Sequence, residues 1–470
     1  MERPDSLAVP SDPDVAVTGT GTPVVIAPGH TFGTVTDKIS SVVLTPKTPI
    51  GWWLGFLFTF ALFNLLMFAA TYLFLKGVGI WGVNIPVGWG FAIVNFVWWI
   101  GIGHAGTLIS AILLLLKQTW RTSINRFAEA MTLFAVACAA LFPILHTGRP
   151  WLAAYWLFPV PLTMGVWPQF RSPLEWDVWA VLTYLIVSVL FWYIGLVPDL
   201  ATVRDRAKKR GWQVFFGIFA LGWRGSARHW AVWNKTYRTI AAIAVPLVVS
   251  VHSEVSLLFA SGQIPGWHST IFPPYFVLGA AFSGFAMVAM IAIVMRHTFG
   301  LGHIVTERHL GVLAMVLLAM GWMTAYGYVF EIFDGYYSGN AREIATIHDR
   351  FFGIYAWSFW GAVVFNFIPL QGLWFARVRR SPVLLFLIST SVVVGMWLER
   401  YMILVTSLYK DFLPSSFGHY TPTFWDWSTY IGMLGLFMTP FLLFMRFLPS
   451  ISIFEDKEVL AREKAEAAHG

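Results

Sequence analysis

The chain has 470 residues, of which 57% are hydrophobic and 12% are charged, with 25 Trp, 41 Phe and a formal net charge of +7. Soluble domains usually carry about 25% charged residues. This composition therefore excludes an ordinary water-soluble domain and predicts an all-α polytopic membrane protein. The single cysteine, Cys138, excludes an intrachain disulfide, and it excludes any iron–sulfur or zinc site with several cysteine ligands from this chain.

The first 50 residues differ from the rest in being rich in Pro, Thr, Val and Gly. They contain no basic stretch followed by an apolar core, which a cleaved signal peptide would need. We expect residues 1–50 to form a flexible tail.

Ten later stretches are apolar and long enough to cross a bilayer as helices, for which about 20 residues are needed. They are 52–75, 87–116, 127–146, 175–199, 239–261, 273–295, 309–332, 350–374, 382–409 and 425–448.

The Lys and Arg residues are sorted between the two sides of these spans. With the N-terminus inside, 24 of the 31 fall on inner connections and 6 on outer ones, while Arg400 lies within a span. Cytoplasmic connections retain positive charge, so both termini are expected in the cytoplasm. Topology then explains the net charge, and no nucleic-acid partner is expected. The inner segment 211–223 is too short to span and is expected to be an interfacial helix or a buried connector.

A faint internal similarity relates spans two to five to spans six to nine. Residues 101–120 resemble 279–299, and 248–255 resemble 393–400, which indicates a parallel repeat, with chance similarity of apolar helices as the alternative. The preferred architecture is two four-helix bundles plus two flanking helices. Its parts are a cytoplasmic tail at 1–50, the first helix and outer loop at 51–86, the first bundle at 87–262, the second bundle at 263–410, the tenth helix at 411–449, and a cytoplasmic tail at 450–470.

An imidazole and a carboxylate stand at adjoining outer ends of two neighbouring spans. His146 ends the third span in LHTGRPW and Asp177 begins the fourth in SPLEWDVWA. Such a pair can accept protons from a lipid-soluble quinol while orienting its head group. The alternative is structural, with Asp177 capping its helix and His146 bonded to backbone. Four further residues could complete a flat apolar slot for the same ligand, namely Arg149, Trp151, Tyr155 and Trp176.

Other ionisable residues within spans are functional candidates because a buried charge in a membrane is costly. They gather in the outer half, and the inner half is expected to be poor in buried acids. His252 and Glu254 point to different helix faces, so only one of them is expected to enter the bundle interior. We favour Glu254, as a proton relay or an interhelical hydrogen bond. Glu399 and Arg400 are adjacent, so Arg400 is expected to pair with an acid on another helix.

His104 stands in the middle of the second span among small residues. A b-type haem in a helical bundle needs two axial ligands at matching depth. His146 and His252 are both expected nearer the outer face, so a packed or hydrogen-bonded histidine is favoured over a haem ligand.

Three segments resemble a known family: the run from Trp98 to Thr132, LFPILHTGRPW at 141–151, and SPLEWDVWA at 172–180. Together with the ten-span layout they resemble the NrfD/PsrC-like integral membrane quinone-interacting subunits, most closely ActC, the larger NrfD-like subunit of bacterial alternative complex III. The resemblance implies a protein of the bacterial inner membrane with two four-helix bundles and no haem or iron–sulfur cluster in this chain. It also implies a quinol site near the outer surface at His146 and Asp177. It also implies a proton path, for which Glu254, His252, Glu399 and Arg400 are the candidates.

The expected function is that of a membrane subunit of a quinol:electron-acceptor oxidoreductase in the respiratory chain, with no activity alone. It would oxidise quinol, plausibly menaquinol, near the periplasmic face and pass electrons to a periplasmic iron–sulfur subunit, and the family implies proton translocation. Further expected partners are c-type cytochrome subunits, a second NrfD-like membrane subunit and, as a further candidate, a terminal cytochrome oxidase, all in contact with the lipid bilayer. The competing hypotheses are a secondary transporter, which would hold its charged residues near the midplane, and a structural membrane anchor of a redox complex.

Overall fold

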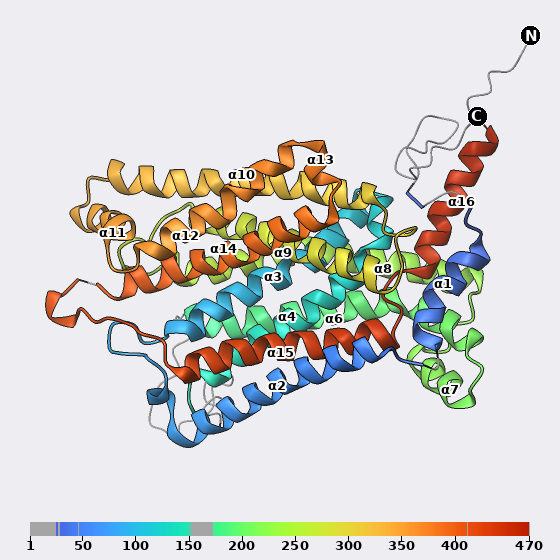
Figure 1. Ribbon diagram of the computed structural model, residues 1–470, viewed down its shortest axis with the longest axis horizontal. Helices are drawn as coiled ribbons and strands as arrows, with labels where there is room; N and C mark the ends of the chain where they lie inside the picture. The colour runs from blue at the N-terminus through green and yellow to red at the C-terminus, as the bar shows by residue number, and fades with distance from the viewer. Residues whose placement is uncertain are drawn as a thin grey trace, which may run out of the picture.

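The computed structural model describes residues 25–26, 29–45, 47–149, 151, 173–410 and 412–469. Throughout these residues the chain is an elongated bundle of helices without a strand (Figure 1). The predicted all-α membrane fold is confirmed for this part of the chain.

Nine helices among the described residues are long and apolar enough to cross a membrane. They are α2 (Ile50–Lys76), α3 (Gly90–Leu115), α4 (Asn125–Leu145), α6 (Pro173–Arg206), α8 (Ala227–Ala260), α9 (Phe272–Thr298), α10 (Glu307–Tyr337), α14 (Pro382–Leu408) and α15 (Phe424–Phe447).

A bent pair takes the place of the predicted span at 350–374. Helix α11 (Ala341–Phe352) meets α12 (Ala356–Phe367) and the following 3₁₀ turn η5 (Pro369–Trp374) at 71°. The break lies at Gly353, where an added Cβ would come within 2.4 Å of the Asp349 carbonyl oxygen. The first and last described helices, α1 (Phe32–Leu44) and α16 (Ile453–His469), lie at the same end of the bundle (Figure 1). This requires an even number of crossings between them, so the α12–η5 segment supplies the tenth.

The crossing helices form two groups of four. Helices α3, α4, α6 and α8 pack around one another, and α9, α10, α12 and α14 form the second group, with α3 packed on both α9 and α14. Helices α2 and α15 pack side by side against α4, outside both groups. This is the predicted pair of four-helix bundles with two flanking helices.

Burial differs strongly between the centre and the margin. In the most apolar part of α3, 83% of residues are buried, against 17% in α2. The two bundles meet through small residues: a Cβ added at Gly284 of α9 would lie 1.8 Å from Cβ of Ala105 in α3. Because helices in lipid associate through close packing of small side chains, α3 is the helix around which both bundles are built.

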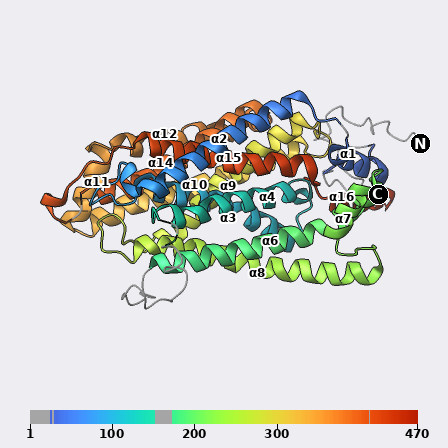
Figure 2. The ribbon, with the colours of Figure 1, turned by 90° about the horizontal axis from the view of Figure 1, so that it is seen from below.

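The short helices α1 (Phe32–Leu44), α7 (Arg210–Phe219) and α16 (Ile453–His469) gather at one end of the bundle (Figures 1 and 2). We call this the basic end, because it holds the connections to which the sequence assigns most Lys and Arg residues. The expectation of a flexible N-terminal tail is wrong for α1, since Arg446 of α15 donates hydrogen bonds to the carbonyl oxygens of Val42, Val43 and Thr45. Helix α7 fits the expected short helix, and it exposes Phe215 and Ile218.

Candidate functional site

A crevice opens at the end opposite the basic end, between α3, α4 and α6. It has a volume of about 400 Å³, counting its open mouth. Its walls are mainly apolar, and its polar groups are the imidazole of His146 and the carboxyl group of Asp177. The described residues that line it are Trp89, Ala92, Ile93, Phe96, Phe142, Pro143, His146 and Asp177. The structure therefore brings the predicted pair together in one cavity.

His146 is the residue at which α4 ends. Its Nδ1 atom lies 2.9 Å from the carbonyl oxygen of Phe142, and its ring stands edge-on to Trp89 at 6.5 Å between centroids. A carbonyl oxygen can only accept, so Nδ1 carries the proton in the neutral ring and Nε2 carries the lone pair. The predicted backbone bond of His146 is present, and it is the bond that leaves Nε2 as the basic atom.

Asp177 is 4% exposed and lies four residues after the start of α6, so it is inside the helix and not its N-cap. Its carboxyl group is within hydrogen-bonding reach of the carboxyl group of Glu254 in α8. Neither Oδ1 of Asp177 nor either carboxyl oxygen of Glu254 receives a hydrogen bond from a donor within the described ranges. Two carboxyl groups can bond each other only when one of them holds a proton, so this pair is built to carry one proton.

Three of the other predicted slot residues are absent from the described lining of the crevice. Arg149 is exposed, and the side chains of Trp151 and Trp176 are 60% and 40% exposed. None of these three is among the described residues that line the crevice. Tyr155 lies outside the described residues.

The aromatic wall of α3 was missed by the sequence analysis. Its members Trp89, Ala92, Ile93 and Phe96 follow the spacing i, i+3, i+4, i+7, which places them on one face of a helix. Pro143, three residues before His146, lies inside α4 and also faces the crevice. A helical stripe ending at the same membrane face as His146, together with a proline beside it, is the signal that could have revealed this wall.

His252 lies deeper than predicted and is fully buried. Its ring centroid is 4.3 Å from that of His104, in the middle of α3, so these two rings are at the same depth. Both His252 and Glu254 enter the interior, and the expectation that only one would do so is wrong. The two side chains reach different neighbours because α8 packs on both α3 and α6.

His104 is held by backbone on both sides of its ring. Nδ1 lies 3.0 Å from the carbonyl oxygen of Ile100 and Nε2 2.7 Å from that of Val248, while the Tyr184 ring stacks on it at 4.8 Å. The prediction of a hydrogen-bonded packing histidine is confirmed. A haem between His104 and His252 does not fit, since rings 4.3 Å apart leave no room for a porphyrin between them.

Glu399 and Arg400 pair with each other, so the prediction that Arg400 would seek an acid on another helix is wrong. Nη1 of Arg400 lies 2.7 Å from Oε1 of Glu399, whose other oxygen accepts a hydrogen bond from the Tyr328 hydroxyl at 2.8 Å. The guanidinium also lies over the ring of Phe276, 4.4 Å from its centroid. The long arginine side chain can fold back along the helix, which sequence spacing alone does not reveal.

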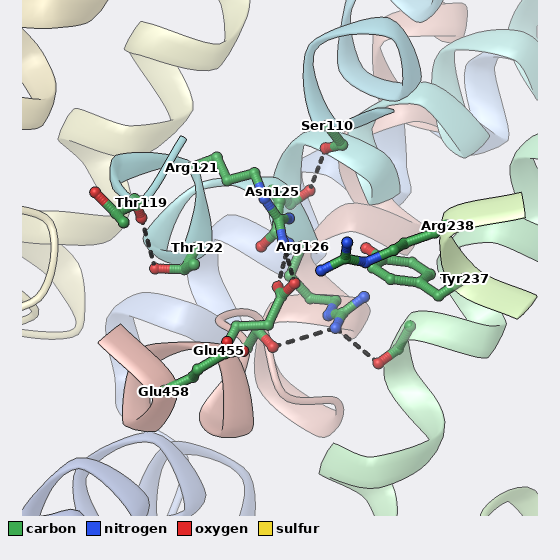
Figure 3. Close-up of polar contacts among 12 residues, drawn as sticks. Ser110, Thr119, Arg121, Thr122, Asn125, Arg126, Tyr237, Arg238, Glu455 and Glu458 are labelled. Carbon is green, nitrogen blue, oxygen red and sulfur yellow. Dashed lines mark hydrogen bonds and ion pairs between the residues drawn. The ribbon is translucent and has the colours of Figure 1, made fainter. Parts of the chain in front are cut away.

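A second polar cluster fills the basic end of the first bundle, where the sequence predicted few buried acids. Figure 3 shows Arg121 and Asn125 directed at Glu455 of α16; Nδ2 of Asn125 lies 2.5 Å from the Glu455 carboxylate, and Arg121 is paired with the same group. Arg126 is fully buried and contacts Glu129 at 3.2 Å and Asp199 at 3.4 Å. The prediction failed because arginines assigned to a connection turn inward and neutralise acids there.

The acids of α16 in this cluster titrate differently. Burial alone would raise the pKa of Glu455, but the attraction of Arg121 and Arg126 outweighs it and lowers that pKa below its usual value. Burial raises the pKa of Asp456 to about 7, and hydrogen bonds from Thr122 and Ser123 only partly oppose this. Two guanidinium groups thus hold Glu455 ionised, while Asp456 is partly protonated at neutral pH.

Comparison with known proteins identifies the family. The model of the family "Polysulphide reductase, NrfD" matches residues 79–410, which include both bundles. The chain belongs to the NrfD family. It is similar to the C subunit of the selenate reductase of Mesobacillus selenatarsenatis, with 22% identity over 79% of this chain and 87% of that protein. It is also similar to the membrane C subunit of a putative dimethyl sulfoxide reductase of Halobacterium salinarum, with 25% identity over 46% of this chain and 48% of that one. This NrfD protein is thus a multi-pass membrane subunit of a quinone-interacting redox complex.

Proposed function

We propose that this NrfD subunit oxidises quinol in the crevice formed by α3, α4 and α6, and that the electrons leave to an iron–sulfur subunit docked at that end. The observation that carries the proposal is the joint placement of His146 and Asp177 in one apolar, aromatic-walled crevice. The two relatives are named as subunits of reductases, and a reductase needs an electron donor. Family membership also favours a redox subunit over a secondary transporter.

The chemistry requires two proton acceptors. A quinol releases two protons and two electrons as it becomes a quinone. The Nε2 atom of His146 can accept one hydroxyl proton, because Nδ1 already donates to the Phe142 carbonyl oxygen. The carboxyl pair of Asp177 and Glu254 can accept the second hydroxyl proton, and the pair then releases a proton to the outside. Trp89 and Phe96 would hold the flat ring between apolar surfaces.

A proton route from Glu254 toward the second bundle would pass His252, with His104 beside it, and reach the pair formed by Arg400 and Glu399. The Phe276 ring neighbours both His252, at 6.1 Å, and the Arg400 guanidinium, at 4.4 Å. If this route couples quinol oxidation to proton translocation, Glu399→Gln lowers the number of protons moved per electron in proteoliposomes. An unchanged ratio would reject the route while leaving the quinol site intact.

The experiment for the quinol site uses the purified complex with quinol and its natural acceptor, proposed to be a c-type cytochrome as in alternative complex III. Asp177→Asn and His146→Ala should each lower turnover about 100-fold or more, as is typical for a lost proton acceptor. Asp334→Asn is the matched control, because Asp334 is a half-buried acid at the same end of the second bundle and outside the crevice.

A steric variant tests the same crevice without touching a titratable group. Ala92 is 5% exposed and lies on the crevice wall, so Ala92→Phe fills the space and should raise the KM for quinol at unchanged assembly. Wild-type turnover in Asp177→Asn and wild-type KM in Ala92→Phe would together show that the crevice is structural and that the subunit is an anchor.

A further inference from the structure

A second large cavity lies at the basic end, between the end of α9 and the start of α14. These two helices pack on each other, and together with Gly300, Gly302 and His303 after α9 they line a crevice of about 1190 Å³, counting the part open to the outside. We call it the α9–α14 crevice. It belongs to the second bundle and lies at the opposite end of the molecule from the quinol crevice, so it needs an explanation of its own.

The inner wall of the α9–α14 crevice is apolar. Ile293 of α9 and Phe386 and Leu387 of α14 line this wall, and Val383 lies one turn before Leu387, at the start of α14. Val383 and Leu387 are 68% and 58% exposed. Both helices are long and apolar enough to cross a membrane, so these exposed apolar side chains are available to a lipid acyl chain.

The mouth of the α9–α14 crevice is cationic. Arg296, His297 and His303 line it, and no Asp or Glu is among its described lining residues. The Lys38 ammonium group adds to this field, since it lies 3.7 Å from the position that a Cβ on Gly300 would occupy. Arg296 forms a loose ion pair with Glu307, whose Oε1 atom lies 3.8 Å from Nη2, beyond hydrogen-bonding distance.

The Arg296 guanidinium has unused donor capacity. Its Nη1 atom is buried and, within the described residues, has no hydrogen-bond partner. The Arg296 side chain as a whole is 23% exposed, so the accessible part of its guanidinium can donate a charge-assisted hydrogen bond to a phosphate oxygen in the crevice. An apolar wall within the bilayer and a cationic mouth at its surface together match one kind of molecule.

We propose that the α9–α14 crevice binds an anionic phospholipid. Its phosphate would lie against Arg296 and His303, and an acyl chain would run along Ile293, Phe386 and Leu387. Basic pockets between transmembrane helices at the membrane surface recognise acidic lipid head groups in this way. The lipid would fill the gap between the two helices, and so support the second bundle at its basic end.

The test uses the purified complex in nanodiscs, with phosphatidylglycerol carrying a photoreactive group on one acyl chain as the probe. After illumination, mass spectrometry should find the probe on peptides of α9 and α14 that contain Ile293, Phe386 or Leu387. Arg296→Gln with His303→Gln should reduce this labelling about 10-fold or more. Arg377→Gln is the matched control, because Arg377 is an exposed arginine at the same end and outside the crevice.

Two comparisons on the unmodified protein keep the proposal open to refutation even if the double variant fails to assemble. A phosphatidylcholine probe with the same acyl chain should label these peptides about 10-fold less, and glycerol phosphate should not displace the phosphatidylglycerol probe. Equal labelling by the two lipids would mean a non-selective apolar groove, and displacement by glycerol phosphate would mean a site for soluble anions. Either result, or unchanged labelling in the double variant, overturns the proposal.

Discussion

Replacing Arg126 by Met should open the first bundle far more than replacing a surface arginine. Arg126 is 0% exposed, and its guanidinium lies 3.2 Å from Glu129 and 3.4 Å from Asp199, which are themselves 1% and 0% exposed. Its Nη2 atom also donates to the carbonyl oxygen of Gly195 at 2.7 Å. Methionine fills similar volume but leaves two buried carboxylates without their cation. Breaking a buried pair in this way typically costs about 3–5 kcal/mol.

The single cysteine provides the assay. Cys138 is fully buried in α4, the same helix as Arg126, so its reaction with a maleimide reports opening of that bundle. A cost of about 3–5 kcal/mol corresponds to labelling about 100-fold to several thousand-fold faster, measured on the Cys138 peptide by mass spectrometry. Arg204→Met is the control, because the Arg204 side chain is 24% exposed and pairs with an exposed Asp205, for which at most about 1 kcal/mol is expected.

Adding Glu129→Gln and Asp199→Asn to Arg126→Met should restore slow labelling, because the uncompensated carboxylates are then gone. If the triple variant labels as fast as Arg126→Met, the loss comes from packing and not from charge. If Arg126→Met alone labels at the wild-type rate, the reasoning is refuted altogether.

Two further outcomes follow from the same structure. Burial raises the pKa of Asp456 to about 7, so its protonated form is favoured when α16 is docked; docking is strongest below the usual Asp pKa of about 3.9 and weakens as pH rises through 7. Amide hydrogen exchange in α16, corrected for the intrinsic effect of pH, should therefore increase from pH 5.5 to 8 in the wild type and stay constant in Asp456→Asn. If exchange in Asp456→Asn responds to pH as it does in the wild type, the prediction is wrong. At the junction of the bundles, Gly284→Ala places a Cβ 1.8 Å from that of Ala105 and should reduce the amount of assembled complex. Gly311→Ala in α10 is the control, because no atom lies within 4 Å of the added Cβ. Equal assembly of both variants would show that α3 and α9 can move apart.

The sequence revealed what depends on hydrophobic length and on position along a span. It placed the crossing segments, and it placed His146 and Asp177 at the same membrane face, where the structure finds both in one crevice. It failed where a long side chain decides the contact. Arg400 folds back on its own neighbour Glu399. Arg126 turns inward and pairs with Glu129 and Asp199, and the periodicity of the sequence does not reveal these pairs. Depth within a span failed as well, because His252 lies level with His104 only through the packing of α8 on α3.

At the end opposite the basic end, the buried acids of the two bundles have different partners. This difference indicates where protons are exchanged. In the second bundle Glu331 is neutralised by Arg350, with 2.6 Å between Oε1 and Nη1. In the first bundle Asp177 faces another acid, Glu254, and among the described residues no ion pair is formed by either group. A carboxylate held by a guanidinium stays ionised, whereas two facing carboxyl groups must share a proton, which they can take up or release. The first bundle therefore offers a proton acceptor beside its apolar crevice, whereas Glu331 in the second bundle is held by its ion pair.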